Sequence, residues 1–333
     1  DTSAFQSMHP GVAHLSSTLS FGLGNGSDSL YLIHKNGTTI DSVGYSDGVG
    51  WPRGANGRGR TLERDASALG MQAAGWFDGC MKGSPGAPYS PCQEKVLISE
   101  VMYKPSSNQP SADWFEVFNP GNQSIDLSGW RISDEAGNSH TVAQGEILSA
   151  GSRRVVAQDL ALFQQIHPSI SNPIGPSGIA LSSSLESIFL SDSSGNLVFS
   201  LCFDGLAPWP LSPNGTGPSL EMLDSTGKMN QAQNWFAGCP NGSPNTWFLT
   251  CQSSVNQMEA TNLLVYPNPF SSELTLQSTK PFTGRLVDVM GRTVWTGNIQ
   301  QGTTELVFGP ELLPGWYALV NEEGQHYAIL IKR

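Results

Sequence analysis

A sequence cassette occurs twice in this chain. The second copy, residues 209–251, reads WPLSPNGTGPSLEMLDSTGKMNQAQNWFAGCPNGSPNTWFLTC, and the first copy, residues 51–92, reads WPRGANGRGRTLERDASALGMQAAGWFDGCMKGSPGAPYSPC. Trp-Pro, Asn-Gly-x-Gly, Leu-Glu, Trp-Phe, Gly-Cys, Gly-Ser-Pro and a final Cys recur in the same order. Because an internal repeat sets the number of domains, we expect two related modules followed by a region of another kind.

The repeat continues upstream of the cassette. Trp51 and Trp209 are 158 residues apart (209 − 51 = 158), and the same offset aligns residues 1–10 with residues 159–168. The first module therefore has no counterpart of residues 95–158. Half a sandwich would expose sheet edges and one face of its core. We expect that the chain is a fragment of a longer polypeptide or that something else completes the first module.

The composition favours an all-β protein. Gly 37 and Pro 22 supply many turns, and only 14% of the residues are charged, a profile typical of short strands joined by tight turns. The formal net charge of -11 argues against broad nucleic-acid binding, which depends on neutralising phosphates. No apolar run approaches the roughly 20 residues that a membrane-spanning helix needs.

Alternating side chains predict the strands of the two modules. Leu197, Phe199, Leu201 and Phe203 alternate with Val198, Ser200 and Cys202, which is the period of a half-buried strand. The expected strands are residues 29–34, 39–45, 96–103, 114–119, 130–133, 153–157, 187–191 and 196–203, with a helical turn at 159–166. Short strands at this spacing predict a β-sandwich.

Paired cysteines recur in the two cassettes. Cys80 and Cys92 match Cys239 and Cys251 with the same internal spacing, and neither pair has the CxxC or His spacing of a zinc site. We therefore expect two local disulfides, each stabilising by roughly 3 kcal/mol in the loop-entropy model. Such bonds imply export to an oxidising compartment. Cys202 is left over, and we interpret it as a buried strand residue rather than a catalytic thiol.

Four segments of the second module resemble a lamin tail domain of the bacterial type. They are VLISEVMYKP, DWFEVFNPGNQSIDLSGWRISD, ILSAGSRRVVA and SIFLSDSSGNLVFSLCFDG. The resemblance spans most of residues 95–250 and implies immunoglobulin-like β-sandwiches in tandem, with roles in binding or scaffolding and no catalytic residues. We expect residues 93–251 to form a complete domain, and residues 1–92 to resemble the latter half of a second one.

A linker, residues 252–261, precedes a different C-terminal region, residues 262–333. NLLVYPNPFSSELTLQ, GRLVDVMGRTVWTG and LLPGWYALVNEEGQHYAILIKR predict six or seven short strands and closely resemble the C-terminal sorting domain of type IX secretion substrates. The residues that carry this resemblance are Tyr266, Pro267, Asn268, Pro269, Asp288, Gly291, Arg292, Leu313, Gly315, Trp316, Tyr317 and Lys332. The resemblance implies export through the periplasm to the cell surface or the medium. The implied partners are the type IX translocon and outer-membrane shuttle or attachment proteins.

Acidic residues on two expected strands raise the question of catalysis. Glu100 and Glu116, with Asp113 nearby, could serve as paired general acid and base. Structural ion pairs are the commoner reason for such clusters, and the candidate partners are Arg131, Arg153 and Arg154. We expect structural pairing.

Four arginines are confined to the first cassette. Arg53, Arg58, Arg60 and Arg64 correspond to Leu211, Thr216, Pro218 and Met222 in the second cassette, so the scaffold does not need them. They form either a patch for an anionic ligand or a solvated face, and the solvated face is favoured because exposed charges usually contribute little.

Other candidate sites are weaker. Gly22, Gly24 and Gly26 lack the flanking strand and helix of a nucleotide loop. The recurring Trp51, Trp76, Trp209 and Trp235, joined by Trp114 and Trp130, indicate core packing more than sugar stacking. Asp192-Ser193-Ser194-Gly195 and Asp204-Gly205 predict hairpin turns rather than calcium loops. The six histidines are scattered, and we expect no metal and no cofactor.

The sequence thus predicts a non-enzymatic, exported all-β region. The lamin-tail modules would act as binding or spacer units with an unknown ligand, and the last domain would address the protein for export. Two alternatives stay open. One is a cell-surface binder of carbohydrate or another polymer, and the other is the accessory tail of an upstream secreted hydrolase of the nuclease or phosphatase type.

Overall fold

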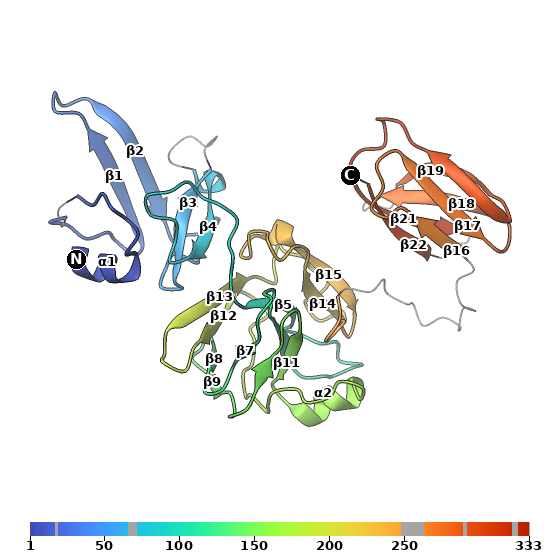
Figure 1. Ribbon diagram of the computed structural model, residues 1–333, viewed down its shortest axis with the longest axis horizontal. Coiled ribbons are helices and arrows are strands. Elements are labelled where there is room, and N and C mark those ends of the chain that lie inside the picture. The colour runs from blue at the N-terminus through green and yellow to red at the C-terminus, as the bar shows by residue number, and fades with distance from the viewer. Residues whose placement is uncertain (17–18, 66–71, 248–262, 289–291, 322–325, 333) are drawn as a thin grey trace. The chain divides into compact units, whose positions relative to one another are not determined.

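The computed structural model describes residues 1–16, 19–65, 72–247, 263–288, 292–321 and 326–332. Two compact units divide the chain, Asp1–Leu249 and Thr250–Arg333. Strands are the main regular structure in both units (Figure 1), which confirms the all-β prediction. The two α-helices of the described chain, α1 (Thr2–Met8) and α2 (Leu160–Ile166), occupy matching places in the repeat, and each is capped by an aspartate, Asp1 or Asp159, that accepts two backbone N–H bonds.

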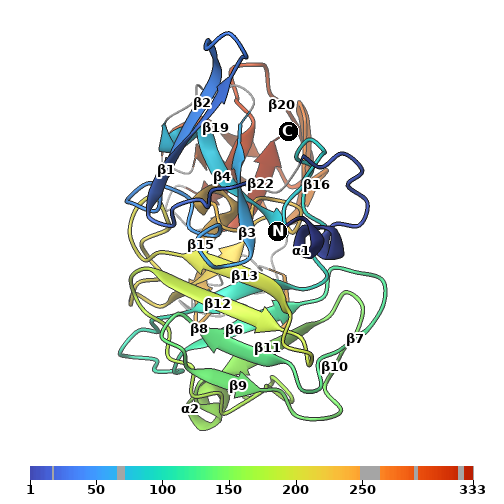
Figure 2. The ribbon, with the colours of Figure 1, turned by 90° about the vertical axis from the view of Figure 1, so that its left-hand side faces the viewer.

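The second repeat folds into two main sheets. One sheet has the order β11 (Arg153–Ala157), β6 (Trp114–Phe118), β5 (Leu97–Met102), β14 (Pro218–Met222), β15 (Trp235–Pro240). The other has the order β13 (Leu197–Phe203), β12 (Glu186–Ser191), β8 (Arg131–Asp134), β9 (Ser139–Thr141), and Figure 2 shows its strands side by side. A short pair, β7 (Ile125–Asp126) and β10 (Ile147–Leu148), lies apart from them.

The core of this module combines side chains from both sheets. Val101 and Leu220 come from the first sheet, Ile188 and Leu201 come from the second, and all four are fully buried. Because facing sheets keep alternate side chains between them, the period-2 pattern places these residues inside. Each such side chain contributes roughly 1.5–3 kcal/mol on burial. A smaller cluster on the far face of the first sheet contains Trp114 and is covered by α2 through Phe163.

One turn device closes three β-hairpins. Asp134, Asp192 and Asp288 each accept, through Oδ1, the backbone N–H of the residue four positions later, at 2.8, 2.9 and 2.9 Å. A short carboxylate can bond its own turn in this way, which is why Asp is favoured there. The hairpin prediction for Asp192 is therefore confirmed.

The first repeat forms two separate two-stranded sheets. β1 (Ser27–Ile33) pairs with β2 (Thr39–Ser46), and β3 (Arg60–Arg64) pairs with β4 (Trp76–Met81). Apolar side chains of the first hairpin face solvent: Leu32 and Ile40 are each 60% exposed. That residues 1–92 form half of a lamin-tail-like domain stays a prediction.

The C-terminal unit has two sheets around its own core. The first has the order β16 (Leu263–Tyr266), β17 (Glu273–Ser278), β20 (Gly302–Val307), and the second β19 (Thr293–Ile299), β18 (Phe282–Asp288), β21 (Gly315–Asn321), β22 (His326–Lys332). Leu274, Leu276, Leu286, Leu319 and Leu330 are fully buried between them. The seven strands in the described part of this unit agree with the six or seven predicted. The predicted linker, residues 252–261, lies outside the described residues.

None of the helices in the described ranges is long and apolar enough to cross a membrane.

Candidate functional site

The first sorting-motif segment connects the start of the C-terminal unit to its last strand. Asn268 Oδ1 accepts the backbone N–H of Ile331 at 2.9 Å. Two residues later the Phe270 N–H donates to the Ile331 carbonyl at 2.8 Å, and the Phe270 ring is buried in the core. Pro267 and Pro269 cannot donate backbone hydrogen bonds, so the asparagine side chain and Phe270 make these contacts. The motif therefore fixes β22, at the end of the chain.

The second motif segment closes the hairpin between β18 and β19. Arg292 Nε and Nη2 lie 2.8 and 2.7 Å from Asp288 Oδ2, in addition to the backbone bond to Oδ1. The Asp288 side chain is nearly buried, whereas the Arg292 side chain is 78% exposed. Asp288 thus holds the turn in place, and the Arg292 guanidinium bound to it faces solvent. Gly291 lies outside the described residues.

The third motif segment shapes the β21–β22 pair. Tyr317 is buried, and its hydroxyl donates to the Leu313 carbonyl at 2.6 Å, which leaves the Leu313 side chain exposed. Gly315 and Lys332 are register partners at the open end of this pair. The motif residues are therefore mostly structural, and they determine where the exposed ones are displayed.

Sequence reasoning missed one exposed surface of this unit. Leu264, Tyr266 and Val307 are exposed on the outward side of the β16–β17–β20 sheet, where their cross-strand neighbours are Gln277, Thr275 and Glu273 respectively. The signal was available in the sequence, because Leu264 and Tyr266 alternate with the inward Leu263 and Val265.

The predicted solvated face or anion patch is wrong for two of the four arginines. Arg58 is 7% exposed and Arg60 5% exposed, and both contact the second repeat. Arg58 pairs with Glu135, and its Nε also donates to Ser187 Oγ at 2.9 Å. Arg64 does lie at the surface and pairs with Asp41 at 3.3 Å. Arg53 is half-buried.

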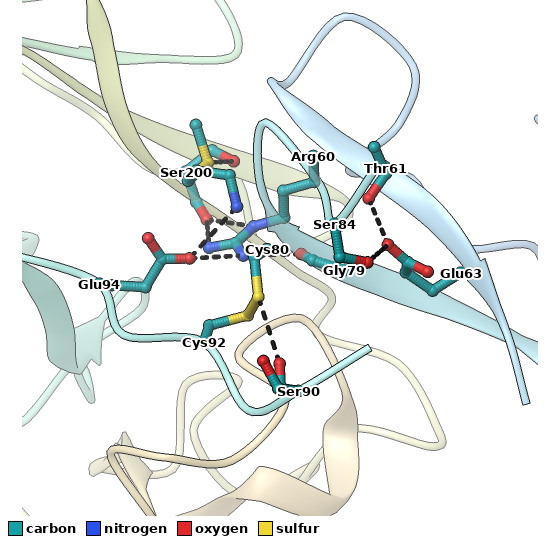
Figure 3. The surroundings of a disulfide bond; sticks show 11 residues. Arg60, Thr61, Glu63, Gly79, Cys80, Ser84, Ser90, Cys92, Glu94 and Ser200 are labelled. Carbon is teal, nitrogen blue, oxygen red and sulfur yellow. Dashed lines mark hydrogen bonds and ion pairs between the residues drawn. A yellow bond between two sulfur atoms is a disulfide. The ribbon is translucent and has the colours of Figure 1, made fainter. Parts of the chain in front are cut away.

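Arg60 caps a strand edge of the second repeat. Its Nε and Nη2 donate to the Ser200 carbonyl on β13 at 3.1 and 2.7 Å, and its Nη1 lies 3.2 Å from Glu94 (Figure 3). β13 is the edge strand of its sheet. Because an open edge presents unpaired backbone groups, a guanidinium that satisfies one of them protects the edge.

A second polar group from the first repeat completes this contact. Asp78 accepts the Gly54 N–H at 2.8 Å and the Asn230 side-chain amide at 2.9 Å, and Asn230 in turn accepts the Cys202 N–H at 3.0 Å. Burial raises the pKa of Asp78, against these hydrogen bonds and the charge of Arg60. Neither Asp78 nor Asn230 was identified from the sequence, since their positions carry no pattern.

The disulfide of the first cassette lies beside this contact. Cys80 and Cys92 are bonded, with their Cα atoms 5.3 Å apart, as predicted. The bridge brings Glu94 back to Arg60 (Figure 3). Cys251 lies outside the described residues, so the second bridge stays a prediction. Cys202 is a buried free thiol whose pKa burial raises to about 11, which agrees with a structural role.

Three glutamates and one arginine form a buried cluster on the first sheet of the second repeat. Glu100 is the register partner of both Glu116 and Glu221, so the three carboxylates lie in a row across β6, β5 and β14. Glu116 lies 2.9 Å from Arg153. The expected structural pairing is present for Glu116, while Glu100 is held by other donors.

Burial shifts the protonation of this cluster. It raises the pKa of Glu116 to about 7, against hydrogen bonds from Ser99 and Asn245 and the charge of Arg153. It raises the pKa of Glu100 well above its usual value, and the neighbouring Glu221 and Glu116 raise it further. Burial also raises the pKa of Glu221. The cluster therefore favours protonated carboxyls, which can donate hydrogen bonds.

The cluster holds the segment that follows β15. The Ser243 N–H donates to Glu100 Oε1 at 2.8 Å, and the Asn245 N–H donates to Glu116 Oε2. Trp247 stacks on the Arg153 guanidinium at 4.0 Å. The cavity that these residues line has a volume of about 10 Å³, which is too small for an organic substrate. The glutamate cluster therefore anchors the segment that leaves the module after β15.

The other acidic and basic candidates are held separately. Asp113 accepts the Leu181 N–H at 2.8 Å, and burial raises its pKa to about 7. Arg154 pairs with Glu146 at 3.2 Å, and Arg131 donates to Ser133. Over the described residues, no group of three or more His, Cys, Asp or Glu side chains is placed to hold a metal ion.

The recurring tryptophans pack in equivalent pairs. The rings of Trp51 and Trp76 lie 6.3 Å apart, and those of Trp209 and Trp235 lie 6.2 Å apart. Trp114, Trp130 and Trp235 are buried. The core-packing interpretation is confirmed for these three residues.

Two family models match the chain. A Lamin Tail Domain matches residues 90–203, and a Secretion system C-terminal sorting domain matches residues 264–331. The first match ends at β13, although β14 and β15, which follow it in the chain, belong to the same sheet as β5, β6 and β11. No curated protein matches the chain.

Solved structures give only distant similarities. The exo-chitosanase CsxA of Amycolatopsis orientalis is 14% identical with a TM-score of 0.20, and the alignment covers 83% of this chain and 32% of that one. Its complex with PNP-beta-D-glucosamine is 15% identical at a TM-score of 0.19, with 72% and 27% covered. Dimeric latent PorU from Porphyromonas gingivalis is 10% identical at 0.18, with 79% and 22% covered. This chain thus spans about a third or less of each of those chains, and scores this low support no argument about fold or function.

The chain therefore contains a lamin tail domain and a type IX C-terminal sorting domain, both of non-catalytic types. The sorting domain indicates export to the cell surface or the extracellular space and implies interaction with the type IX secretion machinery.

Proposed function

We propose that the lamin-tail repeats act as binding or spacer units and that the C-terminal unit is the export signal. The type IX translocon and shuttle or attachment proteins recognise the surface of this unit in its folded state. The observation that carries this proposal is the separate core of the C-terminal unit. A unit with its own core can fold without the modules that precede it. It can then be recognised whatever cargo it follows.

The contacts of the sorting motif support recognition of the folded state. Asn268 and Phe270 hold β22 near the C-terminus, and Asp288 holds the β18–β19 turn from which Arg292 projects. An exposed guanidinium on a fixed turn suits a carboxylate on a receptor, because its donors match that group in a fork. The exposed Leu264, Tyr266 and Val307 add an apolar area on the other sheet.

The spacer role rests on how the two repeats contact each other. Arg58 and Arg60 form buried ion pairs and hydrogen bonds to residues of the second repeat, so the modules have a defined contact rather than a loose tether. Two modules held together in this way act as one spacer unit.

The export proposal is tested by transplanting residues 250–333 onto a reporter that otherwise stays in the periplasm, in a host with type IX secretion. The expected result is surface or extracellular reporter. The variant Asp288→Ala, which removes the carboxylate that holds the Arg292 turn, should reduce export several-fold. Periplasmic reporter despite a folded C-terminal unit would contradict the proposal.

The matched control for that variant lies in the second repeat. Asp192 makes the same contact to the residue four positions later as Asp288 does. In the full chain, Asp192→Ala should leave export unchanged while Asp288→Ala reduces it. Equal effects of the two variants would indicate a general folding defect instead of recognition.

A further inference from the structure

We infer that the first repeat carries an acceptor surface for an added β-segment with the strand pattern of residues 95–158. The first strand of the added segment brings a glutamate, equivalent to Glu100, to Thr61 and Ser84. The acceptor surface consists of the β1–β2 hairpin together with the edge of β3 that has no strand partner among the described residues. Its occupant is a polypeptide segment that forms an apolar strand pair with one inward carboxylate.

The second repeat shows what such a segment does. There β14 pairs with β15 on one side and with β5 on the other, where Glu221 and Glu100 are register partners. Glu100 Oε1 accepts the Ser219 hydroxyl at 2.6 Å and the Ser243 N–H at 2.8 Å. Ser219, Leu220 and Glu221 are buried as a result.

The first repeat has the same polar residues, but no strand equivalent to β5 pairs with them among the described residues. Thr61, Glu63 and Ser84 correspond to Ser219, Glu221 and Ser243. The hydroxyls of Thr61 and Ser84 both lie 3.0 Å from Glu63 Oε1. Among the described residues, β3 pairs with β4 alone, and its residues Thr61, Leu62 and Glu63 remain half-buried.

Two glycines show that the local packing is the same in both repeats. A Cβ on Gly79 would lie 2.4 Å from Glu63, and a Cβ on the equivalent Gly238 would lie 1.9 Å from Glu221. In each repeat the glutamate thus lies directly over a glycine of the neighbouring strand. The first repeat has already formed its half of the cluster that β5 and β6 complete in the second.

The β1–β2 hairpin supports the same inference from its apolar side chains. In the second repeat β12, the counterpart of β1, pairs with β13 on one edge and with β8 on the other. β1 pairs with β2 alone in the described chain. Leu190 on β12 is 1% exposed, whereas the matching Leu32 is 60% exposed, and Tyr31 and Ile33 beside it are also exposed. The hairpin keeps apolar residues suited to a covered position.

An added strand fits this surface better than a second copy of the chain. Unpaired backbone groups along β1 and β3 are satisfied by strand addition, with side-chain pockets giving specificity. A second copy of the chain cannot supply the strand from its own β5, because β5 is already paired with β6 on one edge and with β14 on the other. The occupant that reproduces the contacts of β5 is therefore a further segment of this pattern.

The repeat provides a direct test in the full chain. Because Asp1 aligns with Asp159, a copy of residues 93–158 fused immediately before Asp1 keeps the register of the second repeat. Backbone amides of β1 and β3 should then exchange with solvent more slowly by on the order of a hundredfold, since paired core strands exchange only by opening. Binding of a dye for exposed apolar surface should fall.

Two controls make the result decisive. Amides of β5 and β14 in the original second repeat report whether each fusion is folded, and they should exchange equally in all forms. A fusion whose added copy carries the change equivalent to Glu100→Lys should protect β3 much less. The inference fails if β1 and β3 exchange at the same rate with and without the fused copy. It also fails if the unfused chain is a dimer in which these amides are already slow.

Discussion

At the scale of single residues, the unusual feature is how many charged groups are buried. Glu100, Glu116 and Glu221 share one sheet face with a single guanidinium from Arg153. Removing ions from water is costly unless they are paired or neutralised. One arginine cannot balance three carboxylates, so the cluster is stable when some of them hold protons.

The protonation of Glu116 should make stability fall with rising pH. Its folded pKa, about 7, lies above the unfolded value, so its stabilising effect is complete below about pH 4.5 and is lost as the pH rises through 7. Relative to Glu116→Gln, the parent should lose on the order of 3 kcal/mol of unfolding free energy across that window. Urea unfolding of the full chain, followed at the Trp114 indole by NMR, measures this difference. Parallel pH curves for the two proteins would contradict it.

The two classes of arginine in the first cassette should respond differently to truncation. Arg60 has a side chain that is 1% exposed, and Arg60→Ala would leave Glu94 buried without its partner, at a cost of about 3–5 kcal/mol. Arg64→Ala should change stability by less than about 0.5 kcal/mol, because its pair with Asp41 is exposed. Denaturant unfolding of both variants checks this. Similar losses would show that Arg60 is not buried in solution.

The burial of Arg58 and Arg60 could not be predicted from the sequence. Their partners Glu135 and Ser200 lie 77 and 140 residues away in the chain. No local pattern marks such contacts, and comparison with the second cassette suggested only that the arginines are dispensable. By contrast, the structural role of Cys202 followed from its place on an alternating strand.

At the scale of elements, alternation identified the regular strands and missed the irregular ones. The expected strand at residues 153–157 matches β11, and that at 196–203 differs from β13 by one residue. The four strands inside the two cassettes were not predicted as strands. Register shifts interrupt β3 between Arg60 and Leu62 and β14 between Pro218 and Leu220, and such irregularities break the period of two.

The cassette disulfides are testable at this scale. Peptide mapping without reduction should recover a Cys80–Cys92 pair and a Cys239–Cys251 pair, with Cys202 free. Replacing Cys80 and Cys92 by serine should cost roughly 3 kcal/mol in the loop-entropy model. It should also weaken the contact between Arg60 and Glu94, because the bridge positions the latter. A Cys202 disulfide in the map would contradict the assignment.

At the scale of the whole chain, the sorting unit was predicted well from its sequence, because several of its motif residues have local structural roles. Asp288 and Arg292 close one turn, and Tyr317 bonds a residue four positions earlier. The exposed area around Leu264 and Val307 was missed, although the alternation of Leu264 and Tyr266 with the inward Leu263 and Val265 already marked its part on β16.

The most direct measurement is the location of the protein after deletion of residues 263–333 in a host with type IX secretion. The account predicts that the full chain reaches the cell surface or the medium, while the truncated chain, with β5 and β14 still protected from exchange, accumulates in the periplasm. Normal surface display of the truncated chain would contradict it.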